Sequence, residues 1–253
     1  RDVAPSRGLG DVYKRQDNVP FRKIRQETIN QYKRGGVVSF SWHLDNPLTG
    51  KDAWDVSDTT VVASILPGGV HHAKFISWLD AVAAFMNTLE TEEGTKIPVI
   101  FRPWHEHTGS WFWWGQNLCT ADQYKALWRM THDRMHARGV KNLLYAYSPG
   151  SEPKDSTAYL ERYPGDDIID LVGFDTYQFD RTQYMEQLDK SLAILTEVGK
   201  AHDKPIAITE TGFEAIPDSV WWTQTLYPVI SKYPISYVLV WRNARERVNH
   251  YYA

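Results

Sequence analysis

The chain has 253 residues, of which 42% are hydrophobic, and a formal net charge of −3, which is enough apolar material for one core of about the size of a single α/β barrel. Its Lys and Arg residues are scattered, which argues against a nucleic-acid-binding protein with a concentrated basic face. No run of about 18 or more apolar residues is present, so no transmembrane helix is expected, and the single Cys119 excludes an intrachain disulfide.

The first segment of the chain does not look like part of a domain. Residues 1–16 carry no sustained hydrophobic period and lack the apolar region of a signal peptide. They resemble a translated cloning or library adaptor, and we interpret them as non-native, so that one domain covers residues 17–253. This domain is expected to begin with a helix at Phe21–Lys33.

Predicted strands and helices alternate after this first helix. Six short, apolar segments rich in β-forming residues are predicted strands: Val37–His43, Ile97–Pro103, Leu143–Ser148, Asp170–Asp175, Pro205–Glu210 and Tyr237–Arg242. Between them, apolar residues recur at three- and four-residue steps, which predicts amphipathic helices at Lys74–Leu89, Asp122–Arg138 and Tyr184–Val198. Gly139 follows the second of these helices, where a glycine often ends a helix.

Alternation of this length predicts a parallel sheet covered by helices, in the α/β class. Several predicted strands end in polar or aromatic residues, as in a (β/α)8 TIM barrel, whose active site forms at the carboxyl ends of its strands. A doubly wound sheet is the alternative, but no glycine-rich phosphate loop follows a strand. Because six strands are found rather than eight, we expect an incomplete barrel that lacks its first two strands and part of its last helix.

The first candidate for chemistry is the Trp-rich segment 101–115. Glu106 follows a predicted strand there, and an apolar pocket disfavours a charged carboxylate and raises its pKa. A raised pKa suits a general acid near neutral pH, and Arg102 and His105 could position or tune it. The spacing of His105 and His107 around Glu106 does not place two His on one helical face, so we expect no zinc site.

The second candidate is Glu210, at the end of another apolar strand. An ionised carboxylate held there by polar neighbours could attack an anomeric carbon. Glu210 ends the third predicted strand after the one that precedes Glu106, and three steps around an eight-strand ring place two residues across its mouth. A retaining glycosidase needs its two carboxyl groups about 5–5.5 Å apart, so the sequence predicts that Glu106 and Glu210 form such a pair.

At these two segments the chain resembles glycoside hydrolase family 26, whose best-known members are endo-β-1,4-mannanases. RPWHE (residues 102–106) followed by GSWFWWG (residues 109–115) is similar to the family's acid/base motif, and ITETG (residues 208–212) to its nucleophile motif. The resemblance extends over essentially all of residues 18–253, including SWHLDNP, GFDTY and VLVWRNA. It implies a (β/α)8 barrel and retaining hydrolysis, with the acid/base at the end of strand 4 and the nucleophile at the end of strand 7.

The resemblance also implies a role for individual residues. Glu106 would be the acid/base and Glu210 the nucleophile. The other implied contacts are His105 near the nucleophile, His43 with the sugar on the non-reducing side of the cut, Trp111 stacking at the cleavage point, Asp175 and Tyr177 holding nucleophile and substrate, and Trp241 as an aromatic floor beside Arg242. Arg102 and Trp114 complete the predicted substrate-binding set, Trp114 either as a sugar contact or as wall packing.

These residues predict a retaining hydrolase of β-1,4-mannosidic linkages in mannan, glucomannan or galactomannan, with no cofactor or metal. A β-1,3-1,4-glucanase or a β-1,3-xylanase on the same fold is one alternative. A catalytically dead sugar-binding fragment is another, because missing strands leave exposed sheet edges. We expect a monomer with a polysaccharide or oligosaccharide partner, and an extracellular, cell-surface or periplasmic location.

Overall fold

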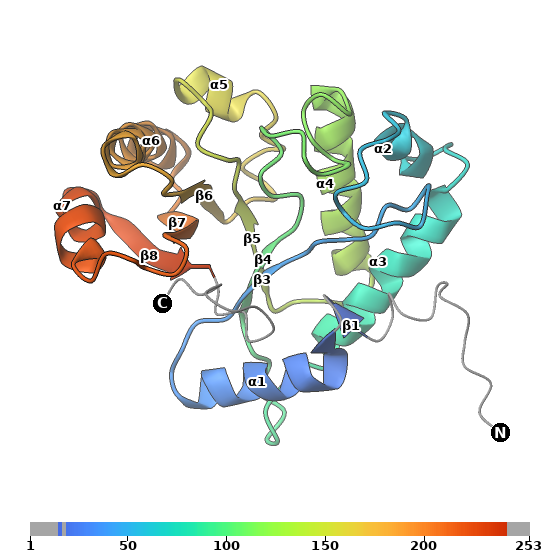
Figure 1. Cartoon of the computed structure of the whole chain (residues 1–253). Helices are drawn as coiled ribbons and strands as arrows, with labels where there is room; N and C mark the ends of the chain where they lie inside the picture. The colour runs from blue at the N-terminus through green and yellow to red at the C-terminus, as the bar shows by residue number, and fades with distance from the viewer. Residues whose placement is uncertain (1–14, 17–18, 242–253) are drawn as a thin grey trace. The chain divides into compact units, whose positions relative to one another are not determined.

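The structure is a computed structural model, which describes residues 15–16 and 19–241. The chain forms two compact units, residues 1–145 and 146–253 (Figure 1). Their boundary falls inside strand β5 (Leu143–Tyr147), which therefore contributes residues to both units.

The first unit contains a short antiparallel strand pair and a series of parallel strands with helices. The antiparallel pair is β1 (Arg15–Gln16) with β2 (Val19–Pro20). Strand β3 (Ser39–Ser41) pairs in parallel with β4 (Val99–Arg102), and β4 pairs in parallel with the start of β5. The helices of this unit are α1 (Phe21–Lys33), α2 (Val61–Ile65), α3 (His72–Asn87) and α4 (Ala121–Ala137).

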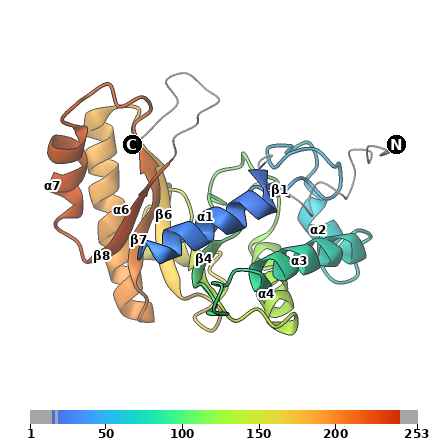
Figure 2. The same ribbon diagram turned by 90° about the horizontal axis from the view of Figure 1, so that it is seen from below.

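Helices α3 and α4 form because their apolar residues fall on one face, which packing then buries. The predicted apolar positions of both helices are buried: Phe75, Trp78, Leu79, Val82 and Met86 on α3, and Tyr124, Leu127, Trp128 and Met135 on α4. The two helices pack side by side, as Figures 1 and 2 show. A capping box of Thr120 and Gln123 starts α4, and Gly139 follows its end with a φ of 74°, the conformation expected there.

One carboxylate links α3 to the end of α4. Asp80 accepts hydrogen bonds at Oδ1 from Nε of Arg134 at 2.5 Å and from Nε of Arg138 at 2.7 Å. The Arg134 hydrogen bond, reinforced by Arg138 and opposed by burial, lowers the pKa of Asp80 to about 2. The ion pairs therefore favour the packed arrangement of these two helices at neutral pH.

The second unit continues the alternation of parallel strands and helices. The end of β5 pairs with β6 (Leu171–Tyr177), β6 pairs with β7 (Ile206–Gly212), and β7 pairs with β8 (Ile235–Val240). The helices are α5 (Ser156–Leu160), α6 (Arg181–His202), the π-helix η1 (Trp222–Leu226) and α7 (Tyr227–Ile230). Figure 2 shows α6 and α7 side by side. Strand β7 is buried along its whole length, as expected for a parallel strand covered on both faces.

All six predicted strands are present, although their ends differ from the prediction. Strands β6 and β7 run past the predicted ends at Asp175 and Glu210, because the ladder continues to the pair Tyr177 and Gly212. Strand β8 begins at Ile235, earlier than predicted. Helix α1 has its predicted bounds, and α6 is longer than predicted at both ends. The short helices α2, α5, η1 and α7 were not predicted, since they offer too few turns for a periodic pattern.

Within each unit, strands that pair are also consecutive along the chain. A doubly wound sheet reverses its strand order at a switch point, so the order observed here contradicts that alternative. Consecutive parallel strands joined by helices are the repeating units of a (β/α) barrel, and six strands of this kind lie within residues 39–240. Among the described residues, none of the helices combines the length and the apolar character needed to cross a membrane.

Candidate active site

The loop after β4 holds the first candidate carboxylate on strained backbone. Strand β4 ends at Arg102, and both Trp104 (φ 56°) and Glu106 (φ 52°) then adopt the left-handed region. This conformation costs about 1–3 kcal/mol at a non-glycine residue and persists only where the surroundings hold it. Such strain concentrates at functional sites, which is consistent with a special role for Glu106.

Buried indole rings hold this loop in place. Trp104, Trp113 and Trp114 are fully buried, and the three rings pack edge to face with centroids 5.1 to 5.5 Å apart. Trp113 donates from Nε1 to the Leu44 carbonyl at 2.9 Å, and Trp114 donates from Nε1 to the His105 carbonyl at 2.8 Å. With no surface exposed, Trp114 lies in the wall of the loop and fixes the carbonyl of His105.

Trp111 is the open ring beside Glu106. Its Nε1 donates to Oε2 of Glu106 at 2.7 Å, and the residue is 41% exposed. The hydrogen bond restricts the rotation of the carboxyl group, while the exposed part of the indole remains available for stacking. One side chain therefore orients Glu106 and presents an apolar surface next to it.

Two His side chains meet at the ends of β3 and β4. Nε2 of His105 lies 3.3 Å from Nε2 of His43. Burial, together with the nearby charge of Arg102, lowers the pKa of His105 well below its usual value, so the ring is neutral at neutral pH. A neutral imidazole has one N–H donor and one acceptor nitrogen, so His105 either donates to His43 or accepts from it at this contact. Arg102 is itself buried, and His43 is partly exposed.

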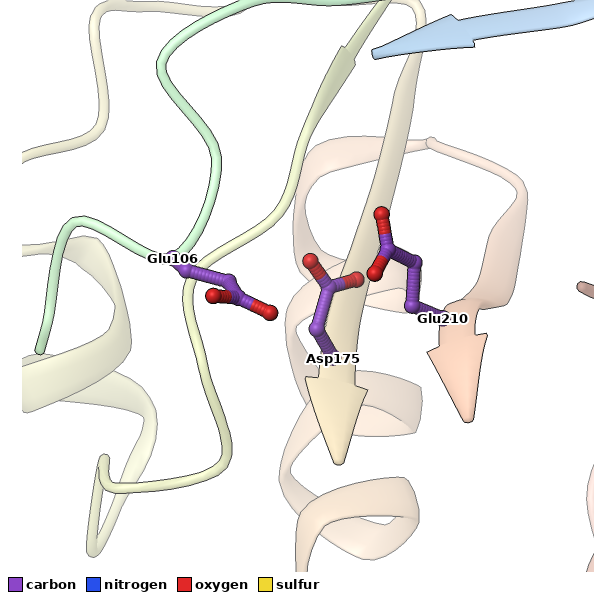
Figure 3. A group of neighbouring side chains, drawn as sticks. All are labelled: Glu106, Asp175 and Glu210. Carbon is purple, nitrogen blue, oxygen red and sulfur yellow. The ribbon is translucent and has the colours of Figure 1, made fainter. Parts of the chain in front are cut away.

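Strands β6 and β7 place two further carboxylates together in the second unit. Asp175 pairs with Glu210 in the ladder, and a carboxylate oxygen of each lies within 4.8 Å of the other. A register shift between Phe174 and Asp175 adds one residue to β7, and such bulges re-aim side chains next to active sites. Figure 3 shows Asp175 and Glu210 on these strands and Glu106 on the loop after β4.

Hydroxyl groups donate to both carboxylates of this strand pair. The Tyr177 hydroxyl donates to Oε2 of Glu210 at 2.5 Å, and the Thr209 hydroxyl donates to Oδ1 of Asp175 at 2.7 Å. Asp175 and Glu210 are each only 3% exposed. A cation could in principle use two carboxylates at this spacing, but these hydroxyl donors already supply them with hydrogen bonds. The Tyr177 hydrogen bond therefore orients the Glu210 carboxyl group beside Asp175.

Strand β8 leads to the predicted aromatic floor. The Trp241 backbone N–H donates to the Thr211 carbonyl at 2.9 Å, which places Trp241 beside the end of β7. The residue is partly exposed. Arg242, the other residue predicted here, lies outside the described residues.

Three residues near these groups were not predicted from the sequence. Thr209 holds Asp175, Phe112 stacks on the Trp114 ring with centroids 4.5 Å apart, and Trp54 is exposed. Thr209 could have been found, because it precedes Glu210 in the same motif. Trp54 lies in a loop without a periodic pattern, so nothing in the sequence distinguishes it from other Trp residues.

The sequence model of glycosyl hydrolase family 26 matches residues 14–243. This chain belongs to glycosyl hydrolase family 26. A family 26 β-mannanase of known structure from Bacteroides ovatus is 62% identical, with a TM-score of 0.94 over 97% of this chain and 72% of that chain. The likeness confirms the predicted α/β class and the incomplete (β/α)8 barrel.

Two curated relatives carry mannanase names. A mannan endo-1,4-β-mannosidase of Bifidobacterium adolescentis is 40% identical over 77% of this chain, and the match covers 20% of that protein. Mannan endo-1,4-β-mannosidase A and B of Caldalkalibacillus mannanilyticus is 29% identical over 86% of this chain and 42% of that protein. The family 26 chain described here thus spans less than half the length of these two relatives.

Proposed function

We propose that this chain is a retaining glycoside hydrolase that cleaves β-1,4-mannosidic linkages in mannan, glucomannan or galactomannan. Membership of family 26 supports the hydrolase class. The mannanase names of the 62% identical structure and the 40% identical relative support the substrate. The observation that carries the proposal is the setting of Glu210, which is buried and held by the Tyr177 hydroxyl at the end of a parallel strand.

In the proposed first step, Glu106 donates its proton to the glycosidic oxygen while a carboxylate oxygen of Glu210 attacks the anomeric carbon. The bond to the leaving sugar breaks with its electron pair going to the protonated oxygen. A covalent glycosyl ester of Glu210 results, and the shortened chain leaves with a hydroxyl group. The Tyr177 hydroxyl bond to Oε2 favours one orientation of Glu210 for this attack.

In the second step, Glu106 acts as a base. It removes a proton from water, the water oxygen attacks the anomeric carbon, and the ester bond to Glu210 breaks. Two displacements at one carbon give overall retention of configuration. Glu106 regains its proton and Glu210 its charge, so neither an oxidant nor a metal enters the balance.

The remaining predicted residues would bind or position the sugar. Trp111 would stack at the cleavage point, because its ring is partly exposed and its Nε1 donates a hydrogen bond to Glu106. His43 would contact the sugar on the non-reducing side of the cut, and His105 would position the His43 ring. Asp175 would support Glu210 and the substrate, and Trp241 with Arg242 would form the floor. Trp114 would act as wall packing behind His105.

Chemical rescue of two variants tests the assignment of roles. With an activated aryl β-mannoside, azide should restore turnover of Glu210→Ala and give an α-mannosyl azide, because azide replaces the missing nucleophile. Azide should restore turnover of Glu106→Ala through the intact ester and give a β-mannosyl azide. The opposite anomers, or retained mannan hydrolysis by Glu210→Ala, would contradict the proposal.

The substrate assignment has its own test. Product release from mannan, lichenan and β-1,3-xylan should be measured side by side, and we expect release from mannan. Release from lichenan or xylan alone would favour the alternative specificities, and binding without release would favour a sugar-binding fragment. Because mannan is an extracellular polymer, we further propose an extracellular, cell-surface or periplasmic location for a monomeric protein.

A further inference from the structure

Trp54 is an exposed indole ring stacked on a predicted sugar-binding residue. It lies in the loop between β3 and α2 and is 54% exposed. Its ring stacks on the His43 ring, with centroids 5.4 Å apart and planes 11° from parallel. One ring face is therefore covered by His43, while about half of the residue remains open.

The loop that carries Trp54 is built around a buried amide. Asn46 is fully buried, and its Nδ2 donates to the Asp55 carbonyl at 2.9 Å. Its Oδ1 accepts the backbone N–H groups of Leu48 and Thr49 at 3.0 and 3.2 Å. The Asp55 carboxylate in turn accepts the Thr49 hydroxyl at 2.6 Å. These bonds close the loop on itself, so Trp54 is held on an ordered segment.

Two further contacts hold the loop and the Trp54 ring. The Ala53 carbonyl accepts the backbone N–H of Trp113 at 3.1 Å, which ties the loop to the segment after β4. Phe112, which is only 3% exposed, packs against Trp54 with centroids 5.4 Å apart. The ring is thus rigid before any ligand arrives, and rigid exposed rings bind at a low cost in conformational entropy.

Ring contacts place Trp54 next to His43. His105, the neighbour of Glu106, contacts His43 edge to face with centroids 4.8 Å apart, and His43 in turn contacts Trp54. Phe112 packs against all three of these rings. If His43 serves the sugar next to the cut, the adjacent Trp54 ring is suitably placed for the next sugar.

We propose that Trp54 is a specificity-determining stacking platform for the β-linked pyranose one position beyond the sugar that His43 contacts, on the non-reducing side of the cut. The axial and equatorial C–H groups of a pyranose form an apolar face that matches an open indole face. This inference rests on the proposed function, because His43 defines the direction.

Binding without turnover tests the platform. In a Glu210→Ala background, mannohexaose affinity is measured by calorimetry with Trp54 intact, with Trp54→Ala and with Trp54→Phe. A lost ring stack of about 1.4 kcal/mol corresponds to a tenfold change, so we expect Trp54→Ala to weaken binding about tenfold and Trp54→Phe to restore most of it. The matched control is Trp222→Ala, a 37% exposed Trp on η1.

Kinetics in the otherwise unchanged chain separate a platform from a structural residue. With mannohexaose, Trp54→Ala should raise KM with little change in kcat. With 2,4-dinitrophenyl β-mannoside, whose single sugar cannot reach the platform, its kcat/KM should stay within twofold. Equal losses on both substrates, or unchanged mannohexaose binding, would overturn the inference.

A cellohexaose arm distinguishes failure of this inference from failure of the proposed function. If cellohexaose binds in place of mannohexaose and its affinity falls with Trp54→Ala, the platform stands and the mannan assignment fails. If mannohexaose binds and is cleaved but its affinity is unchanged in Trp54→Ala, the mannan assignment stands and the platform fails.

Discussion

The loop after β4 and the paired ends of β6 and β7 each present a carboxylate, but they are built differently. Glu106 has left-handed backbone in a loop that contains three buried indole rings, and its Oε2 accepts the N–H of the exposed Trp111. Glu210 stands within a strand ladder, and its Oε2 accepts the hydroxyl of Tyr177.

The difference is consistent with the two tasks that we propose for these residues. A group that must give up and regain a proton is suited to an apolar setting, where the neutral acid is tolerated. A nucleophile needs a fixed orientation, and the Tyr177 hydroxyl and the strand ladder orient Glu210. This setting suits the proposed attack from one direction.

Removing the proposed nucleophile should have the largest effect. Glu210→Ala should lower kcat on mannan by about 10⁴–10⁶-fold, since no other group can form the ester. The matched control is Glu214→Ala, an exposed Glu close in sequence, which should retain wild-type activity. Comparable losses in both variants would show that the segment, rather than the Glu210 carboxylate, is required.

Removing the proposed acid/base should have a smaller effect that depends on the leaving group. Glu106→Ala should lower kcat on mannan by about 10²–10⁴-fold, because proton transfer supplies that much. On 2,4-dinitrophenyl β-mannoside, whose leaving group needs no proton, formation of the ester should be almost unchanged in burst kinetics. The control is Glu92→Ala, whose side chain is 83% exposed. A fall in the burst rate on 2,4-dinitrophenyl β-mannoside as large as the fall in kcat on mannan would contradict the acid role of Glu106.

Weakening the support of Glu210 should have an intermediate effect. Tyr177→Phe removes the hydroxyl donor to Oε2 and keeps the ring, and a hydrogen bond to a charged group contributes about 1.5–3 kcal/mol. We expect kcat to fall about 10- to 100-fold with little change in KM or melting temperature. A larger change in KM than in kcat would indicate that Tyr177 binds sugar rather than orients Glu210.

The smallest effect on catalysis is expected from the ion pairs between α3 and α4. The folded pKa of Asp80 is about 2, below its ordinary value of 3.8, so its stabilisation is present above about pH 4 and is lost as the pH falls toward 2. Asp80→Asn should lower the free energy of unfolding by about 1–2 kcal/mol at pH 6 and by much less at pH 2.5. Denaturant unfolding at both pH values measures this.

Asp189→Asn supplies the comparison in the second unit. Asp189 pairs with Lys232, but both side chains are substantially exposed, so little loss of stability is expected. An equal loss in the two variants, or a loss for Asp80→Asn that does not depend on pH, would contradict the role given to Asp80.

Most of the strand and helix order follows from the sequence, because parallel strands and long amphipathic helices have distinct periods. The apolar faces of α3 and α4 were predicted residue by residue. The bulge beside Asp175 could not be predicted from the sequence, because a register shift depends on which strands pair. For the same reason β6 and β7 extend further than their apolar runs.

The candidate residues show a similar division. Glu106 and Glu210 can be found from their motifs, because acidic residues at strand ends in an unusual setting are rare. The separate tasks of the indole rings cannot be predicted in this way, because Trp54, Trp111 and Trp114 are the same residue type and the sequence does not show their surroundings. Only the three-dimensional structure shows that Trp114 is buried, that Trp111 donates a hydrogen bond to Glu106 and that Trp54 stacks on His43.

Trapping of the covalent intermediate tests the central claim most directly. Incubation with a 2-deoxy-2-fluoro-mannosyl fluoride, followed by proteolysis and mass spectrometry, identifies the residue that forms the ester. We predict a single labelled peptide with the sugar on Glu210. A label on any other residue, or no label from an enzyme that turns mannan over with inversion, would contradict the account.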